Sequence, residues 1–147
     1  MLSLVRRILD FSAPFLVTLW AGSLWTVCLI VAPQLFVTLP ERQLAGQMAA
    51  RLFWIQTWLG VVVATVLVAV LAVQKTPERY RGVWWLILVT AVAPLASDLI
   101  LGPMMAAARE ANDMARFGML HGASAVLFLT ACLSALALVW KLNQPAK

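Results

Sequence analysis

The stretch FWIQTWLGVVVATVLVAVLAV, residues 53–73, decides the fold class of this chain. It contains no charged residue, and its few polar side chains are isolated among Val, Leu and Ala. About 20 apolar residues in a helix cross the roughly 30 Å hydrocarbon core of a bilayer. Lipid offers the backbone no hydrogen-bond partners, so a spanning segment must satisfy its own N–H and C=O groups. Residues 53–73 are therefore predicted to form a transmembrane helix.

Three further apolar stretches have a similar length: 13–35, 83–101 and 120–140. The first is too long for the apolar core of a signal peptide, which has about 7–15 residues, so we interpret it as a retained span. The runs lack the alternation of a barrel strand. The composition, 63% hydrophobic and 12% charged, does not suit a water-exposed surface. We predict an all-α, polytopic membrane protein, a four-transmembrane-helix bundle forming one domain over residues 1–147.

The connections between the spans differ in kind. Residues 74–82 form a short basic turn, whereas 40–52 and 102–119 are rich in residues that favour helices. We predict an amphipathic outer helix between spans 1 and 2. In the other long connection, Asn112-Asp113 is the best turn, which predicts an extended hairpin between the third and fourth helices.

The basic residues predict the orientation. One side of the membrane would hold seven of them, and the other side four. The seven are Arg6, Arg7, Lys75, Arg79, Arg81, Lys141 and Lys147; the four are Arg42, Arg51, Arg109 and Arg116. Cytoplasmic loops carry the excess of Lys and Arg. We therefore expect a multi-pass protein of the cell's inner (cytoplasmic) membrane with both termini in the cytoplasm, and we attribute the net charge of +5 to lipid contact, not to nucleic acid.

Asp98 is the first candidate for chemistry, because an ionisable side chain within a membrane span is costly and marks a functional site by default. We place it about one turn from the outer end of the third span, after Pro94, which favours a kink. The alternative is an interfacial aspartate that reaches water or pairs with Arg51 or Arg109. The sequence leaves both interpretations open.

His121, the only histidine, is expected at the outer end of the fourth span, three residues before Ser124. Gln34 and Gln56 are expected at the outer ends of the first two spans. These four side chains and Asp98 are a candidate outer-end polar site. A lone histidine at a helix start is also compatible with a simple hydrogen-bonding role.

Methionines gather in the predicted outer segments. His121 with Met104, Met105 and Met114 is a candidate site for a soft metal ion such as Cu(I), because thioether and imidazole groups suit such ions. Methionine as a pliable packing residue is the competing explanation. The sequence names no cofactor.

Small and aromatic residues predict how the helices pack. Gly22 and Thr26 in the first span and Gly122 in the fourth would let backbones approach closely. Trp20 and Trp25 lie too deep for an interfacial belt and are expected between helices. Cys28 and Cys132 also lie within predicted spans. Neither belongs to a CxxC motif or has a histidine at ligand spacing, so we expect free buried thiols.

Several short patterns resemble the transmembrane protein 205-like family, whose domain has no known function. They are Trp20-x-Gly22, Pro33-x-x-Phe36-x-x-Leu39-Pro40, Arg51-Leu52-Phe53 and Phe117-x-x-Leu120-His121-Gly122-x-Ser124. The resemblance covers most of the chain and implies a four-helix membrane protein without supplying a mechanism.

No phosphate loop, nucleophile elbow, HExxH or carboxylate pair within a span occurs in the sequence, which does not favour an enzyme. The leading hypothesis is a non-enzymatic inner-membrane protein that acts by association, as a homo-oligomer or an accessory subunit. The expected partners are membrane lipids and either itself or another membrane protein. The alternative is a small cation or soft-metal (copper-like) binder or transporter. A redox or quinone-interacting subunit is the third hypothesis.

Overall fold

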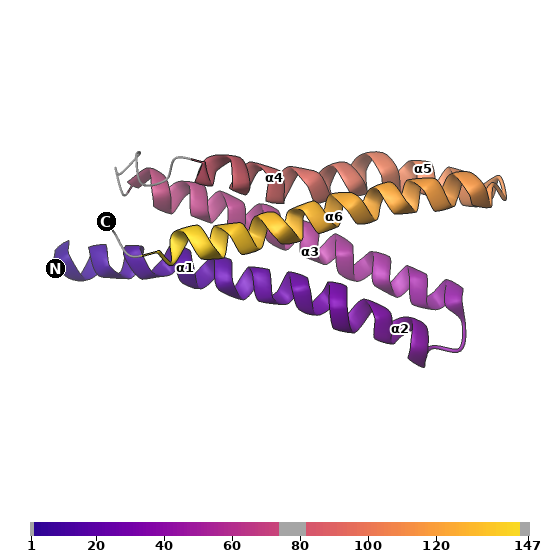
Figure 1. Ribbon diagram of the computed structural model, residues 1–147, viewed down its shortest axis with the longest axis horizontal. Coiled ribbons are helices and arrows are strands. Elements are labelled where there is room, and N and C mark those ends of the chain that lie inside the picture. Colours follow the sequence, from indigo (N-terminus) through magenta and orange to yellow (C-terminus); the bar gives the residue numbers. More distant parts are fainter. Residues whose placement is uncertain (1, 74–81, 145–147) are drawn as a thin grey trace.

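The computed structural model describes residues 2–73 and 82–144, with side chains from residue 11 onward, and all its regular structure is helical. The elements are α1 (Leu2–Thr26), η1 (Val27–Val31), α2 (Ala32–Thr38), α3 (Arg42–Val73), α4 (Val83–Ala96), η2 (Ser97–Leu101), α5 (Gly102–Glu110) and α6 (Met114–Leu142). The two η elements are π-helical turns. Each joins its neighbours without a break, so the chain makes four long antiparallel helices (Figure 1).

All four helices are long and apolar enough to cross a membrane: Phe11–Thr38, Arg42–Val73, Val83–Glu110 and Met114–Leu142. The prediction of an all-α protein with four spans is confirmed. The helices are longer than the predicted spans. For example, α3 has 32 residues, which measure roughly 48 Å at 1.5 Å per residue.

Residues 42–52 are helical, as predicted, but they do not form a separate surface helix. They are the first turns of α3, because no proline interrupts the chain from Arg42 to Val73. The predicted hairpin is present: α5 ends at Glu110, Asn112 has a positive φ of 55°, and the Asp113 side chain caps α6 by accepting from the N–H of Arg116. Apart from Gly82, the basic turn expected at 74–82 lies outside the described residues.

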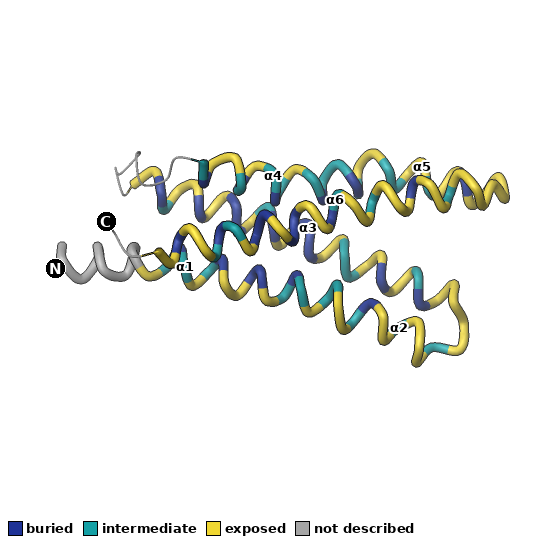
Figure 2. Tube along the Cα trace, viewed as in Figure 1, coloured by how far each residue is buried: buried dark blue, intermediate teal, exposed yellow. Residues whose placement is uncertain are grey.

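The packed core lies in the half of the bundle that contains the start of α1 and the end of α6 (Figures 1 and 2). It joins all four helices through buried side chains such as Val17, Leu24, Leu67, Ile87 and Leu138. Trp20 is buried there and Trp25 packs against it, as predicted.

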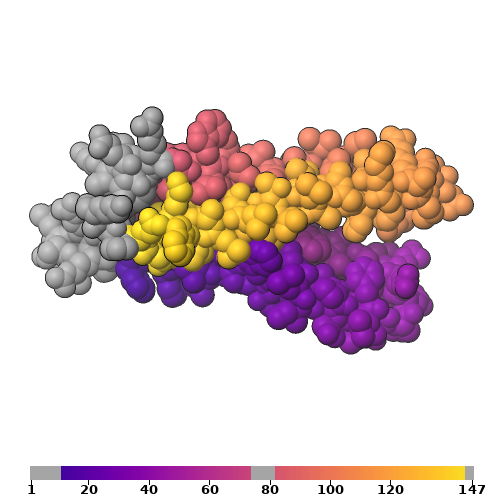
Figure 3. All heavy atoms as spheres, viewed as in Figure 1, coloured from indigo at the N-terminus to yellow at the C-terminus, as the bar shows by residue number. Residues whose placement is uncertain are grey.

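The opposite half is much more exposed, and there the chain forms two lobes (Figures 2 and 3). In one lobe α2 packs on α3, and in the other α5 packs on α6. The two pairs diverge from the core toward their connecting turns (Figure 1). Polar side chains at the level where the two pairs begin to separate would lie deep in the bundle.

Both π turns precede a proline, and they occupy equivalent positions in two similar stretches of sequence. η1 is followed by Ala32-Pro33, and η2 by Gly102-Pro103. A proline has no N–H and its ring crowds the preceding turn, which favours a local shift of the helical hydrogen bonds. The N–H of Ala32 donates to the carbonyl of Val27, five residues back, and that of Gly102 donates likewise to Ser97.

The two segments that contain the π turns and the prolines after them are VCLIVAP at 27–33 and SDLILGP at 97–103. They are identical at three of seven positions, including the proline. Each half of the chain therefore has a helix with a π turn, a connecting turn at the end of the bundle away from the core, and a second helix. The packing follows this repeat, since α1 contacts α6 of the second half and α4 contacts α3 of the first. Cys28 and Asp98 occupy equivalent positions in the two halves.

Candidate functional site

Asp98 lies near the middle of its helix, not one turn from the end. The expected third span ended at Leu101, but the helix continues to Glu110 through α5. Asp98 is therefore twelve residues, or about 18 Å, from Glu110, where that helix ends. The reason is that Gly102-Pro103 shifts the hydrogen-bond register without ending the helix.

The carboxyl of Asp98 lies beside the side chain of Thr57 on α3. Thr57 is 2% exposed and lies halfway along α3, fifteen residues from Arg42 and sixteen from Val73. Its hydroxyl donates to the carbonyl of Phe53 at 3.0 Å. Because a hydroxyl has a single proton, Thr57 cannot also donate to Asp98 while this bond is made.

The second carboxyl oxygen of Asp98, Oδ2, is buried and has no hydrogen-bond partner among the described residues. The arginines proposed as partners lie elsewhere. Arg51 lies over the ring of Trp54 at 4.8 Å, and Arg109 over the ring of Phe117 at 4.6 Å. The alternative of an interfacial Asp98 paired with one of these arginines is therefore wrong.

Asp98 and Thr57 belong to a layer of polar side chains inside the bundle. Hydroxyl and amide groups extend this polar layer to the other helices. Ser97 is 2% exposed, and its hydroxyl is 2.6 Å from that of Ser124 on α6. On the other side of Thr57, Gln56 is 8% exposed and its Oε1 accepts from Ser23 of α1 at 3.3 Å. The layer thus crosses the bundle from α1 through α3 and η2 to α6.

Three of the five predicted polar residues, Asp98, Ser124 and Gln56, belong to this layer, but among the described residues no hydrogen bond joins any two of them directly. The structure does not bring the other two to them. Gln34 is exposed on α2, and His121 is exposed on α6 with its ring stacked on Phe117 at 6.0 Å. Gln56 lies deep because α3 begins at Arg42, about four turns before it.

Sequence reasoning missed Ser23, Thr57 and Ser97, because a hydroxyl within an apolar span is not distinctive. The repeat of VCLIVAP and SDLILGP was the available signal for Ser97 and Asp98, since it marks the two positions where the helix register changes. π turns inside α-helices are frequent at functional sites.

The candidate soft-metal residues do not share a buried site. His121, Met104 and Met114 are exposed and Met105 is half-buried. Among the described residues no three His, Cys, Asp or Glu side chains are grouped so that they could hold a metal ion. The soft-metal site stays a prediction, now on the exposed α5–α6 lobe.

The glycines expected to pack helices inside the bundle face outward. A Cβ added at Gly22 or Gly122 would meet nothing within 4 Å, and Thr26 is exposed with its hydroxyl donating to the Gly22 carbonyl. The predicted packing role within the bundle is therefore wrong. Gly60 makes the close approach instead, because a Cβ there would lie 2.8 Å from Cζ2 of Trp20.

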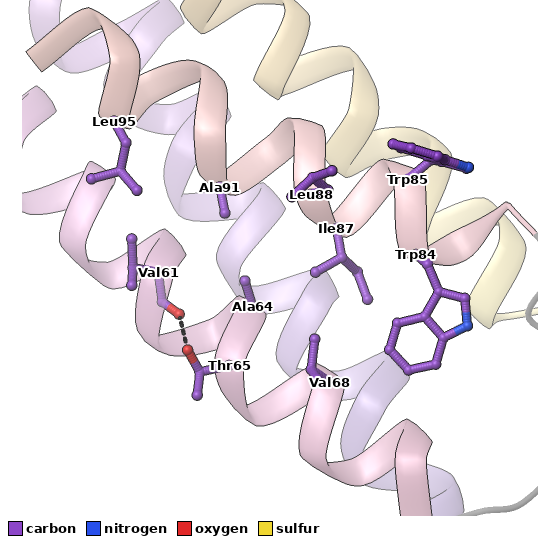
Figure 4. Close-up of a pocket in the computed structure, with 10 residues that line it drawn as sticks. All are labelled: Val61, Ala64, Thr65, Val68, Trp84, Trp85, Ile87, Leu88, Ala91 and Leu95. Atoms are coloured by element: carbon purple, nitrogen blue, oxygen red, sulfur yellow. Dashed lines mark hydrogen bonds between the residues drawn. The ribbon is translucent and has the colours of Figure 1, made fainter. Parts of the chain in front are cut away.

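An apolar groove of about 540 Å³ runs between α3 and α4, in the half of the bundle that holds the core (Figure 4). Val61, Ala64, Ala91 and Leu95 line it, with Trp84 near one end. Its one side-chain hydroxyl, that of Thr65, donates to the carbonyl of Val61. Apart from the indole N–H groups of Trp84 and Trp85, the groove is lined by apolar side chains, so it suits lipid hydrocarbon.

A comparison with protein-family models identifies the family of this chain. The family model described as "Domain of unknown function (DUF4149)" matches residues 15–113, about two thirds of the chain. The chain belongs to the DUF4149 family. No curated protein and no solved structure matches it.

The DUF4149 match includes both π turns, Thr57 and Asp98, and it ends at Asp113, which caps α6. Ser124 and Cys132 lie beyond the matched region. The family is thus one of unknown function, as predicted, while a specific relation to the transmembrane protein 205-like family stays a prediction.

Proposed function

We propose that this DUF4149 protein binds and releases a proton at Asp98, in the interior of its four-helix bundle. The observation that carries the proposal is the buried Oδ2 of Asp98, which lacks a hydrogen-bond partner within residues 11–73 and 82–144. A carboxylate without a cationic partner is far more costly in an apolar interior than a neutral carboxylic acid.

The hydrogen bonds around Asp98 suit the protonated form. A neutral carboxylic acid can donate its proton to the oxygen of Thr57, while the Thr57 hydroxyl donates to the carbonyl of Phe53. If Asp98 loses its proton, Thr57 must turn its hydroxyl away from Phe53 to donate to the carboxylate. Protonation would thus change the contact between η2 and α3.

This proposal is the small-cation hypothesis with the proton as the cation. We expect the protein to couple proton binding at Asp98 to a change in the contact between η2 and α3. We place proton access on the predicted outer side, toward which the two lobes diverge (Figure 1). The placement of both termini in the cytoplasm of an inner-membrane protein is part of the proposal and rests on the distribution of Lys and Arg.

Infrared spectroscopy of the protein in lipid vesicles tests the proposal. At neutral pH we expect the carbonyl stretch of a protonated carboxyl, shifted by deuterium exchange and lost in Asp98→Asn. The matched control is Asp113→Asn, which removes an exposed carboxyl but keeps a capping side chain, so the stretch should remain. On raising the pH the stretch should disappear reversibly.

An ionised Asp98 across the whole neutral range would overturn the proposal. If the stretch appeared only when Na⁺ and K⁺ were withdrawn, the carboxylate would bind a metal ion instead of a proton. Association with itself or with another membrane protein, the leading sequence hypothesis, stays a prediction; the outward-facing Gly22 and Gly122 are compatible with a contact to a second helix.

A further inference from the structure

The chain's two cysteines come together across the two halves of the bundle. Cys28 lies in η1 and Cys132 in α6, and their sulfur atoms are 3.7 Å apart. Both are free thiols, as predicted. A disulfide needs a sulfur–sulfur distance of about 2.05 Å, so the two atoms must approach by roughly 1.7 Å.

The backbone around the two thiols allows that approach. The carbonyl of Cys28 receives no hydrogen bond from Ala32, which donates to Val27, and none from Pro33, which has no N–H. Cys28 therefore sits in the least regular turn of its helix. Cys132 is held firmly, since it is 2% exposed and its carbonyl accepts from the indole N–H of Trp25 at 3.3 Å.

A cavity of about 210 Å³ borders both thiols. Its inner wall carries the rings of Trp25, Phe53 and Phe128, and its rim carries Leu29 and Leu129, which are 64% and 53% exposed. Those rim side chains face lipid, so the cavity opens sideways into the bilayer. At roughly 30 Å³ per water the volume equals about seven waters, enough for one six-membered ring.

We propose that Cys28 and Cys132 are a redox-active dithiol that a lipid-soluble quinone oxidises to a disulfide. The two S–H bonds break and one S–S bond forms, which releases two protons and two electrons. The quinone takes up both protons on its carbonyl oxygens, together with both electrons, and becomes a hydroquinone. The disulfide would tie η1 to α6 and so join the two halves.

A quinone fits this site better than a water-soluble oxidant. The cavity is reached from hydrocarbon and lined almost entirely by apolar groups, and its aromatic rings can stack on a flat quinone head. Asp98 does not line this cavity, so the dithiol should react equally well in Asp98→Asn.

The reaction can be followed with reduced protein in lipid vesicles, without oxygen, after addition of a short-chain ubiquinone. We expect one hydroquinone, seen by absorbance, for every two thiols lost. Because the chain has only two cysteines, an intrachain disulfide identifies this pair. Cys28→Ser and Cys132→Ser each retain one thiol and should form no hydroquinone.

A rim variant tests the route of the quinone. Leu129→Trp should slow hydroquinone formation at least tenfold but leave oxidation by the small reagent diamide within twofold. Leu133→Trp, one turn along α6 and outside the cavity, is the matched control and should react like the unmodified protein.

Four results would overturn the proposal. A disulfide formed with diamide but not with the quinone would show that a quinone is not the oxidant. A failure of both oxidants to form the disulfide, or a disulfide that joins two chains, would rule out the intrachain pair. Hydroquinone formed as fast by Cys28→Ser would show that the electrons come from another source.

Discussion

The contact between Gly60 of α3 and Trp20 of α1 provides a sharp test of the bundle's packing. A Cβ at Gly60 would lie 2.8 Å from Cζ2 of Trp20, whereas ordinary contact begins at 3.4 Å. The helix or the ring must therefore move by about 0.6 Å (3.4 − 2.8). Trp20 is only 4% exposed and is surrounded by core side chains, so the ring has little room.

We expect Gly60→Ala to destabilise the bundle by about 1–3 kcal/mol, the usual cost of overpacking a core. Alanine also favours the helix by about 0.5–1 kcal/mol over glycine, which would hide part of this cost. Gly46→Ala is the matched control, because Gly46 lies in the same helix and its Cβ would meet nothing within 4 Å. The difference between the two variants then isolates the overpacking.

Unfolding by denaturing detergent, followed by circular dichroism, measures both free energies. Trp20→Phe removes Cζ2, so combining it with Gly60→Ala should recover most of the loss and give a coupling energy of opposite sign. If Gly60→Ala unfolds at the same detergent concentration as Gly46→Ala, then α1 and α3 are not in the close contact described here.

Two further predictions concern single contacts. Ser97→Ala and Ser124→Ala should each destabilise the bundle, and a double-mutant cycle should give a coupling of about 0.6–1.7 kcal/mol for their 2.6 Å hydrogen bond; additive losses would mean that the bond is not made. Gly82→Ala should cost about 1–2 kcal/mol because Gly82 has a φ of +84°, whereas the exposed Gly118→Ala should not; the same unfolding assay compares them.

The candidate site was only partly predictable. Asp98 stands out from the sequence because it is the only acidic or basic residue between 83 and 108. Its partner Thr57 does not stand out, since threonine is common in apolar helices and no spacing links two residues on different helices. Gln34 and His121 looked equally suitable, yet both side chains are exposed.

The predicted distance of Asp98 from the end of its helix was too short for a related reason. Hydropathy marks where apolar residues stop, and it placed the end of the third span at Leu101. The helix does not stop there, because a π turn absorbs Pro103 and the Ala-rich segment that follows still favours helix. Residues 42–52 are likewise part of α3, because this segment favours helix and contains no proline.

By itself the sequence determined that this is a four-helix membrane protein, because its long apolar runs lack the alternation of barrel strands and a helix satisfies its own backbone in lipid. The sequence also places Pro14, Pro33, Pro94 and Pro103 within these helices, but only the structure shows that the register shifts before Pro33 and Pro103 and not before the other two. Only the tertiary structure decided which side chains meet across those shifts. Asp98 reaches Thr57 on α3, and Cys28 reaches Cys132 on α6, because each half of the chain packs its π-turn helix against the other half.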